Sequence, residues 1–189
     1  MDEKKPTKVL IKQKRNWFQI VAPKTFGGRI IGETLASDPA KIKGRKLTIS
    51  AGVAFGDMKK QHVSLIFNLA DFEGNSISSN VEGLILSQSY LKRGIRRFKG
   101  KLEDSFIVKC GDGNVRVKVL LLLRKEVHRS VGSNLLKMVR DASSKFCDGK
   151  KFDDLVMSIL NDSFNRLIKD SLKRIYPVAD VEIRYFAKE

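Results

Sequence analysis

The chain has 189 residues, 42% of them hydrophobic, and its 37 Lys and Arg against 21 Asp and Glu give a net charge of +16. So large a cationic excess destabilises a compact chain by self-repulsion, which argues against an ordinary soluble enzyme and for a polyanionic partner. Nucleic acid is the first candidate for that partner, and an anionic membrane surface is the second.

The sequence shows no pattern typical of a catalytic or metal site. His62 and His128 are isolated, and Cys110 and Cys147 lack the short spacing of zinc ligands, so two reduced, buried thiols are expected. The acidic residues form adjacent pairs rather than a triad with Ser and His. No apolar run reaches about 18 residues, and residues 1–15 lack the apolar core of a signal peptide. We expect no enzyme activity, cofactor, metal, small-molecule substrate or membrane insertion.

The N-terminal segment, residues 1–15, is polar and strongly cationic, and Pro6 disfavours a helix there. It is either a disordered solubilising tail or a basic extension that becomes ordered on RNA phosphates, and the net charge favours the second. We expect residues 16–189 to form a single domain. The RNA-binding candidates in the extension are Lys8, Lys12, Lys14 and Arg15.

A short strand is predicted from Trp17 to Val21, where Pro23 stops it. Trp17 is the only tryptophan; it could stack on a base, but its apolar neighbours favour a place in the core or at a sheet edge. The glycines between Phe26 and Gly32 lack the Gly-Lys-Ser/Thr ending of a P-loop, so they indicate a tight turn.

A short helical turn is predicted over Glu33–Ala36, and Ser37-Asp38-Pro39 is typical of the start of another. A dense basic loop follows around Gly44. The candidates from the glycine-rich turn and this loop are Arg29, Lys41, Lys43, Arg45 and Lys46.

Alternating apolar residues predict strands over 47–53 and 63–70, and the apolar run 81–86 predicts a further short strand. Ser87 is the expected N-cap of a helix over Gln88–Phe98. Outside its apolar stripe this helix carries cations and no acid, which favours an anion-binding role over an ordinary solvated face. Its candidates, with the residue that follows it, are Lys92, Arg93, Arg96, Arg97 and Lys99.

Two alternating runs joined by Gly111–Asn114 predict a β-hairpin over 102–125. The unalternated leucines 120–123 indicate burial on both faces of the second strand. Basic residues follow the hairpin, and the last RNA-binding candidates are Arg124, Lys125 and Arg129.

The C-terminal third is predicted to be helical until a final strand, with Ser130 or Ser133 as the first N-cap. The pattern of the whole chain predicts an α+β fold. Its core is expected to be an antiparallel, β-barrel-like sheet with the basic helix inserted. The predicted C-terminal elements are a helix ending near Phe146, a helix over 152–160, a third helix or a bent continuation over 164–175, and a strand over 178–186.

Several short motifs follow one another in a specific order. They are Asn16–Pro23, Phe26 with Ile31–Leu35, Lys43-Gly44-Arg45, Asp112-Gly113 and Ile175–Val181, which reads Ile-Tyr-Pro-Val-Ala-Asp-Val. Together they resemble the archaeal and eukaryotic small-subunit ribosomal protein family S-three-A-e (e-S-one in universal naming) over nearly the whole chain. The short tails resemble the archaeal members, because the eukaryotic ones carry longer C-terminal extensions.

The resemblance implies a cytoplasmic, structural ribosomal protein with a β-barrel-like core and no catalytic residues. It implies a place on the platform of the small subunit, near the rRNA 3′ end and the messenger exit, in contact with small-subunit rRNA and neighbouring platform proteins. RNA contacts do not carry over residue by residue, so the candidates above rest on charge. The alternatives are a non-ribosomal RNA-binding or RNA-chaperone protein and a membrane-surface protein, which the few large apolar residues of the basic helix disfavour.

Overall fold

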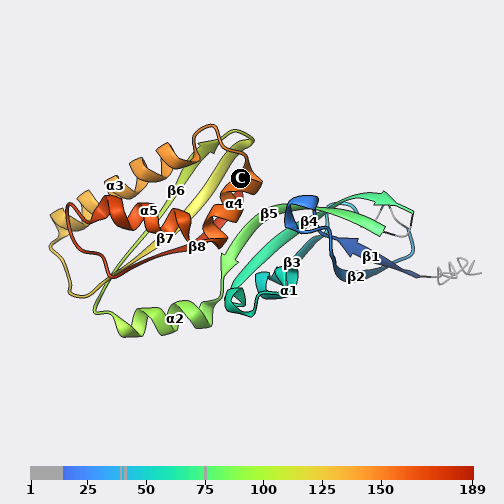
Figure 1. Cartoon of the computed structure of the whole chain (residues 1–189), viewed down its shortest axis with the longest axis horizontal. Helices are drawn as coiled ribbons and strands as arrows, with labels where there is room; N and C mark the ends of the chain where they lie inside the picture. The colour runs from blue at the N-terminus through green and yellow to red at the C-terminus, as the bar shows by residue number, and fades with distance from the viewer. Residues whose placement is uncertain (1–14, 39, 41, 75) are drawn as a thin grey trace, which may run out of the picture.

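The computed structural model describes residues 15–189 except 39, 41 and 75 (Figure 1). Strands and helices mix along the chain, so the predicted α+β class is confirmed. The strands are β1 (Asn16–Val21), β2 (Ile30–Ala36), β3 (Lys46–Ser50), β4 (Val63–Glu73), β5 (Ser76–Leu86), β6 (Gly100–Cys110), β7 (Gly113–Leu123) and β8 (Asp180–Lys188). The helices are α1 (Ala51–Phe55), α2 (Gln88–Arg97), α3 (Arg129–Cys147), α4 (Phe152–Leu160) and α5 (Ser163–Leu172), with short 3-10 turns η1 (Lys24–Phe26) and η3 (Met58–Lys60).

Strand β5 carries the sheet from one half of the molecule to the other. Its first residues pair in parallel with β1, from Gln19↔Ser76 to Val21↔Ser78. Its last residues pair antiparallel with β8, from Gly83↔Ala187 to Ile85↔Tyr185. The order is therefore β2-β1-β5-β8-β7-β6, while β4 and then β3 extend from the other edge of β5.

The sheet stays open rather than closing into the expected barrel. Among the described residues no strand pairing joins any two of the edge strands β2, β3 and β6. Between β2 and the start of β3 a side chain forms the link, because the Arg45 guanidinium donates to the Thr34 hydroxyl at 3.3 Å and to the Leu35 carbonyl at 3.4 Å. The β1–β5 pairing is also parallel, so the sheet is mixed.

The predicted hairpin forms the centre of the C-terminal half. Residues 120–123 of β7 are all at most 2% exposed, as predicted for a strand buried on both faces. Leu120 and Leu122 line a cavity beneath α2. The alternate residues, Leu121 and Leu123, point to the opposite face, which α3, α4 and α5 cover (Figure 1).

A second, smaller core lies in the N-terminal half, between the β1–β2 hairpin and strands β4 and β5. Its large members include Phe18, Ile20, Leu69 and Ile77, each at most 6% exposed. Ile31 and Leu47 pack against it from β2 and β3. The alternation of β1 therefore directs Phe18 and Ile20 inward.

Two predictions in the N-terminal half were wrong. Residues 33–36, predicted as a helical turn, are the end of β2, because pairing with β1 outweighs the local helical pattern. The strand predicted to reach Val53 ends at Ser50, whose hydroxyl accepts a hydrogen bond from the Gly52 N–H at 3.2 Å and caps α1. Val53 is consequently 69% exposed.

The lengths of β4 and β5 were also underestimated. Strand β4 continues to Glu73, and β5 begins at Ser76 rather than at Val81. The two strands form one long hairpin whose turn includes Gly74 at φ 65°, a conformation that favours glycine.

The predicted helices of the C-terminal third are confirmed with two corrections. The N-cap of α3 is His128, whose Nδ1 accepts from the Ser130 N–H at 3.4 Å, rather than Ser130 or Ser133. Helices α4 and α5 are separate, because Asp162 between them has φ 57°, and α5 ends at Leu172. The final strand predicted by alternation is β8, and it lies in the sheet between β5 and β7.

None of the helices in the described part of the chain combines the length and the apolar character needed to cross a membrane.

Candidate nucleic-acid interface

Helix α2 separates an apolar stripe from a cationic face. Leu91 is 4% exposed, and Tyr90, Ile95 and Phe98 pack against the main core. Because residues four apart share one face of a helix, this packing leaves the other face to solvent. The exposed side chains there are Lys92, Arg93, Arg96 and Arg97.

The hairpin brings a second group of cations to the same end of the molecule. Gly100 at the start of β6 pairs with Leu123 at the end of β7. Lys99 and the two residues after Leu123 are therefore neighbours in space, next to the end of α2 (Figure 1). We call the combined set the α2 basic surface: Lys92, Arg93, Arg96, Arg97, Lys99, Arg124 and Lys125, all exposed.

Within this surface, the backbone at the start of β6 packs closely against the backbone that follows β7. A methyl group at Gly100 would lie 2.8 Å from the Lys125 carbonyl oxygen and 3.0 Å from Leu123 Cβ. Only a residue without a side chain lets the backbones approach so closely. Arg129, also exposed, opens α3 a few residues beyond Lys125.

The α2 basic surface is electrostatically unpaired within the described part of the chain. Its cations lie in no ion pair or side-chain hydrogen bond there; one of them, Arg93, lies 5.6 Å from the centre of the Tyr90 ring. Repulsion among cations that lie in no ion pair destabilises the isolated protein, and an anionic ligand would relieve it.

The other candidate cations are largely engaged within the protein. Arg29 donates to the Phe55 carbonyl at 3.3 Å, and Lys43 pairs with Asp71 at 3.0 Å. Arg45 bridges β2 and β3 as described, and Lys46 forms an ion pair with Glu82. These residues lie toward the opposite end of the long axis from α2 (Figure 1), so the structure does not gather all candidates on one surface. Arg15 is exposed before β1, whereas Lys8, Lys12, Lys14 and Lys41 lie outside the described residues.

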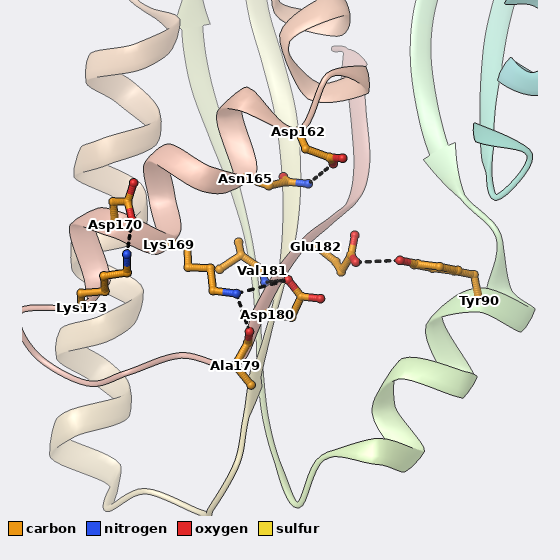
Figure 2. Close-up of polar contacts among 10 residues, drawn as sticks. All are labelled: Tyr90, Asp162, Asn165, Lys169, Asp170, Lys173, Ala179, Asp180, Val181 and Glu182. Atoms are coloured by element: carbon orange, nitrogen blue, oxygen red, sulfur yellow. Dashed lines mark hydrogen bonds and ion pairs between the residues drawn. The ribbon is translucent and has the colours of Figure 1, made fainter. Parts of the chain in front are cut away.

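A partly buried polar contact joins α2 to the sheet. The Tyr90 hydroxyl donates to Glu182 Oε1 on β8 at 3.1 Å (Figure 2), and the Tyr90 ring stacks on His62 with 4.3 Å between ring centres. Beside it, Lys169 of α5 donates to the Ala179 carbonyl at 2.6 Å. The contact between Tyr90 and Glu182 was not predicted, because 92 positions separate its two partners in sequence. The only signal was a tyrosine within the apolar stripe.

Burial shifts the pKa values of both residues in the Tyr90–Glu182 contact. It raises the pKa of Glu182 to about 7, and the nearby charge of Asp180 adds to the effect, while the hydrogen bond from Tyr90 acts in the opposite direction. Burial, followed by the charge of Glu182, raises the pKa of Tyr90 to about 12. Tyr90 therefore remains a neutral donor at physiological pH.

We expect Glu182→Gln to stabilise the protein above neutral pH. Between pH 4.5 and about 7 the folded chain keeps a proton on Glu182 that the unfolded chain has lost, so stability falls as pH rises through this window. The full loss is about 3 kcal/mol. Gln keeps an acceptor for Tyr90 without a buried charge, so E182Q should be about 3 kcal/mol more stable than wild type at pH 8 and nearly equal to it at pH 4.5. Urea unfolding at both pH values measures this difference.

Glu126→Gln is the control for that experiment, because Glu126 is exposed and its removal changes net charge equally. It should change the unfolding free energy by less than about 0.5 kcal/mol at either pH. An E182Q effect of the same size at pH 4.5 and pH 8 would contradict the assignment of a raised pKa.

Among the described residues no group of three or more His, Cys, Asp or Glu side chains is placed to hold a metal ion. Cys147 is buried at the end of α3, and burial raises the pKa of its thiol to about 12. Cys110 is only half-buried, which corrects the expectation of two buried thiols.

Trp17 contradicts the expectation of a place in the core, although it does lie at a sheet edge, since β1 pairs only with β2 at this position. Its side chain is 62% exposed, because Phe18 and Ile20 occupy the inward positions of β1 and leave Trp17 on the outer face. The prediction rested on apolar neighbours in sequence, which in a strand point to the opposite side of the sheet.

A comparison with models of known protein families identifies the family of this chain. The model of the Ribosomal S3Ae family matches residues 4–187. The chain belongs to this family. The resemblance found in its motifs is thereby confirmed for a ribosomal protein family.

Curated relatives of this S3Ae member come from archaea. Small ribosomal subunit protein eS1 of Nanoarchaeum equitans is 29% identical over 178 residues, which cover 94% of this chain and 90% of the relative. The protein of the same name from Saccharolobus islandicus is 32% identical over 170 residues, covering 89% of this chain and 82% of the relative. That of Desulfurococcus amylolyticus is 29% identical over 170 residues, covering 89% and 80%.

Proposed function

We propose that this S3Ae family member is a structural, non-catalytic constituent of the small ribosomal subunit that binds rRNA through phosphate contacts. The observation that carries the proposal is the α2 basic surface, an exposed group of cations of which none lies in an ion pair within the described residues. Such contacts position a protein on folded RNA without reading its sequence. The family and the names of its relatives support the ribosomal setting.

The proposal includes a location and partners. We place the protein in the cytoplasm, on the platform of the small subunit near the rRNA 3′ end and the messenger exit, beside other platform proteins. Residues 16–189 act as one domain, and the basic extension 1–15 orders on rRNA. Crosslinking of the native particle with residue-level readout tests the location: crosslinks from Arg96 or Lys125 to rRNA far from its 3′ end would refute the platform assignment.

Sedimentation tests whether the protein is an integral subunit component. After a wash in high salt it should remain with the small subunit, whereas a free RNA-binding or RNA-chaperone protein should be released. With about six phosphates engaged, the affinity for an rRNA fragment should fall with salt at a log–log slope of about −5. An affinity that does not change with salt would contradict phosphate binding.

A further inference from the structure

The outer face of the β1–β2 hairpin presents an aromatic side chain that the phosphate contacts do not use. Trp17 is 62% exposed, and its indole has no hydrogen bond, ring contact or cation contact among the described residues. The half-buried Leu35 lies across from it on β2, and the next pair on the same face is Gln19 with Glu33, both exposed. Trp17 therefore presents its ring to solvent beside one apolar and two polar side chains.

A cation precedes this indole along the chain. The exposed Arg15 lies two residues before Trp17. An exposed aromatic ring with a neighbouring cation is an arrangement that binds a base by stacking and its phosphate by charge.

We propose that Trp17 is a stacking site for an unpaired base of RNA, with Arg15 next to the adjoining phosphate. This proposal rests on the proposed function and adds a single-stranded segment to the folded RNA contacted by the α2 basic surface. A protein partner fits the site less well, because a docking site for a protein needs a wider apolar patch around its central aromatic residue. Stacking accepts any base, so the site selects unpaired strands rather than a sequence.

The fluorescence of the single tryptophan reports on this site directly. The full chain is titrated with a single-stranded oligoribonucleotide and with an abasic oligonucleotide of the same length and charge. We expect the first to quench Trp17 emission and the second to bind weakly without quenching. Trp17→Ala should weaken binding of the first about 5- to 100-fold, and Trp17→Phe should restore most of the loss. The slope of affinity against salt should stay the same, since no charge is removed.

Ile30→Ala provides the matched control. Ile30 is 59% exposed on the neighbouring strand, so its truncation removes a similar exposed apolar group. It should leave both the affinity and the quenching unchanged. Because Trp17 and Ile30 are both exposed, circular dichroism should show native folding of each variant.

The results of these titrations distinguish a failure of the stacking site from a failure of the proposed rRNA binding. If the oligoribonucleotide binds with a steep salt dependence but Trp17 emission is unchanged and W17A binds as wild type, the stacking site is overturned and phosphate binding stands. If wild type binds neither oligonucleotide nor the rRNA fragment at any salt concentration, the proposed function fails together with it.

Discussion

Replacing Lys92, Arg96 and Arg97 together by Gln should weaken binding to the rRNA fragment by about 100-fold or more at 0.1 M salt. Each phosphate that the protein no longer neutralises lowers the log–log salt slope by about 0.9 for a duplex, so three fewer phosphates change the slope by about 3. If the two proteins bind equally at 1 M salt, this difference in slope makes the affinity of the variant at least about 100-fold lower than that of wild type at 0.1 M salt. Filter binding across a salt series measures both quantities.

The control for this variant removes the same charge from the opposite face of the sheet. Lys137 and Lys145 on α3 and Lys151 before α4 are exposed, and these helices lie across the sheet from α2 (Figure 1). Replacing them by Gln lowers net charge equally, so long-range attraction falls equally in both variants. If the two triple variants lose affinity to the same extent, net charge rather than the α2 basic surface explains the binding.

Gly83→Val should destabilise the protein by about 3 kcal/mol or more, or prevent folding. A Cβ at Gly83 would lie 2.5 Å from Ala187 Cβ, 2.7 Å from the Phe186 carbonyl oxygen and 2.9 Å from Ala187 Cα. These atoms belong to the backbone of β8 or are fixed to it, so the strands must separate where β5 joins the two halves of the sheet. Urea unfolding followed by circular dichroism measures the loss, and Gly83→Ala should show a smaller change of the same sign.

Gly32→Ala is the matched control, since Gly32 is also a glycine within a strand. A Cβ there would lie 3.9 Å from Leu47 Cδ2, an ordinary contact. We expect a change within about 1 kcal/mol, with a stabilising contribution from the reduced entropy of the unfolded chain. If G83A and G32A unfold at the same urea concentration, the close packing of β5 on β8 does not limit stability.

The sequence predicts an element well where local periodicity decides it. Helix α4 has the predicted bounds, and the hairpin around Asp112 and strand β8 are found where alternation placed them. Residues 33–36 and Val53 were predicted wrongly because their conformation depends on pairing with β1 and on the cap supplied by Ser50. Such distant or single-atom contacts leave no periodic signal.

The candidate interface was predicted in composition but not in arrangement. Charge alone identified the cations of α2, and the structure shows that they are exposed; their contact with RNA stays a prediction. The pairing of Lys43 with Asp71 and of Lys46 with Glu82 joins residues 28 and 36 positions apart, so the sequence did not distinguish engaged from free cations. The exposure of Trp17 depends on which face of β1 meets the second core.

The position of β8 constrains the order in which the protein can mature during synthesis. This strand leaves the ribosome after every other described element, yet it lies between β5 and β7. Until it emerges, the nascent chain presents two unpaired strand edges that are open to aggregation. We therefore expect the growing chain to need a chaperone, or early capture by its assembly partner, until residues 180–188 have been translated.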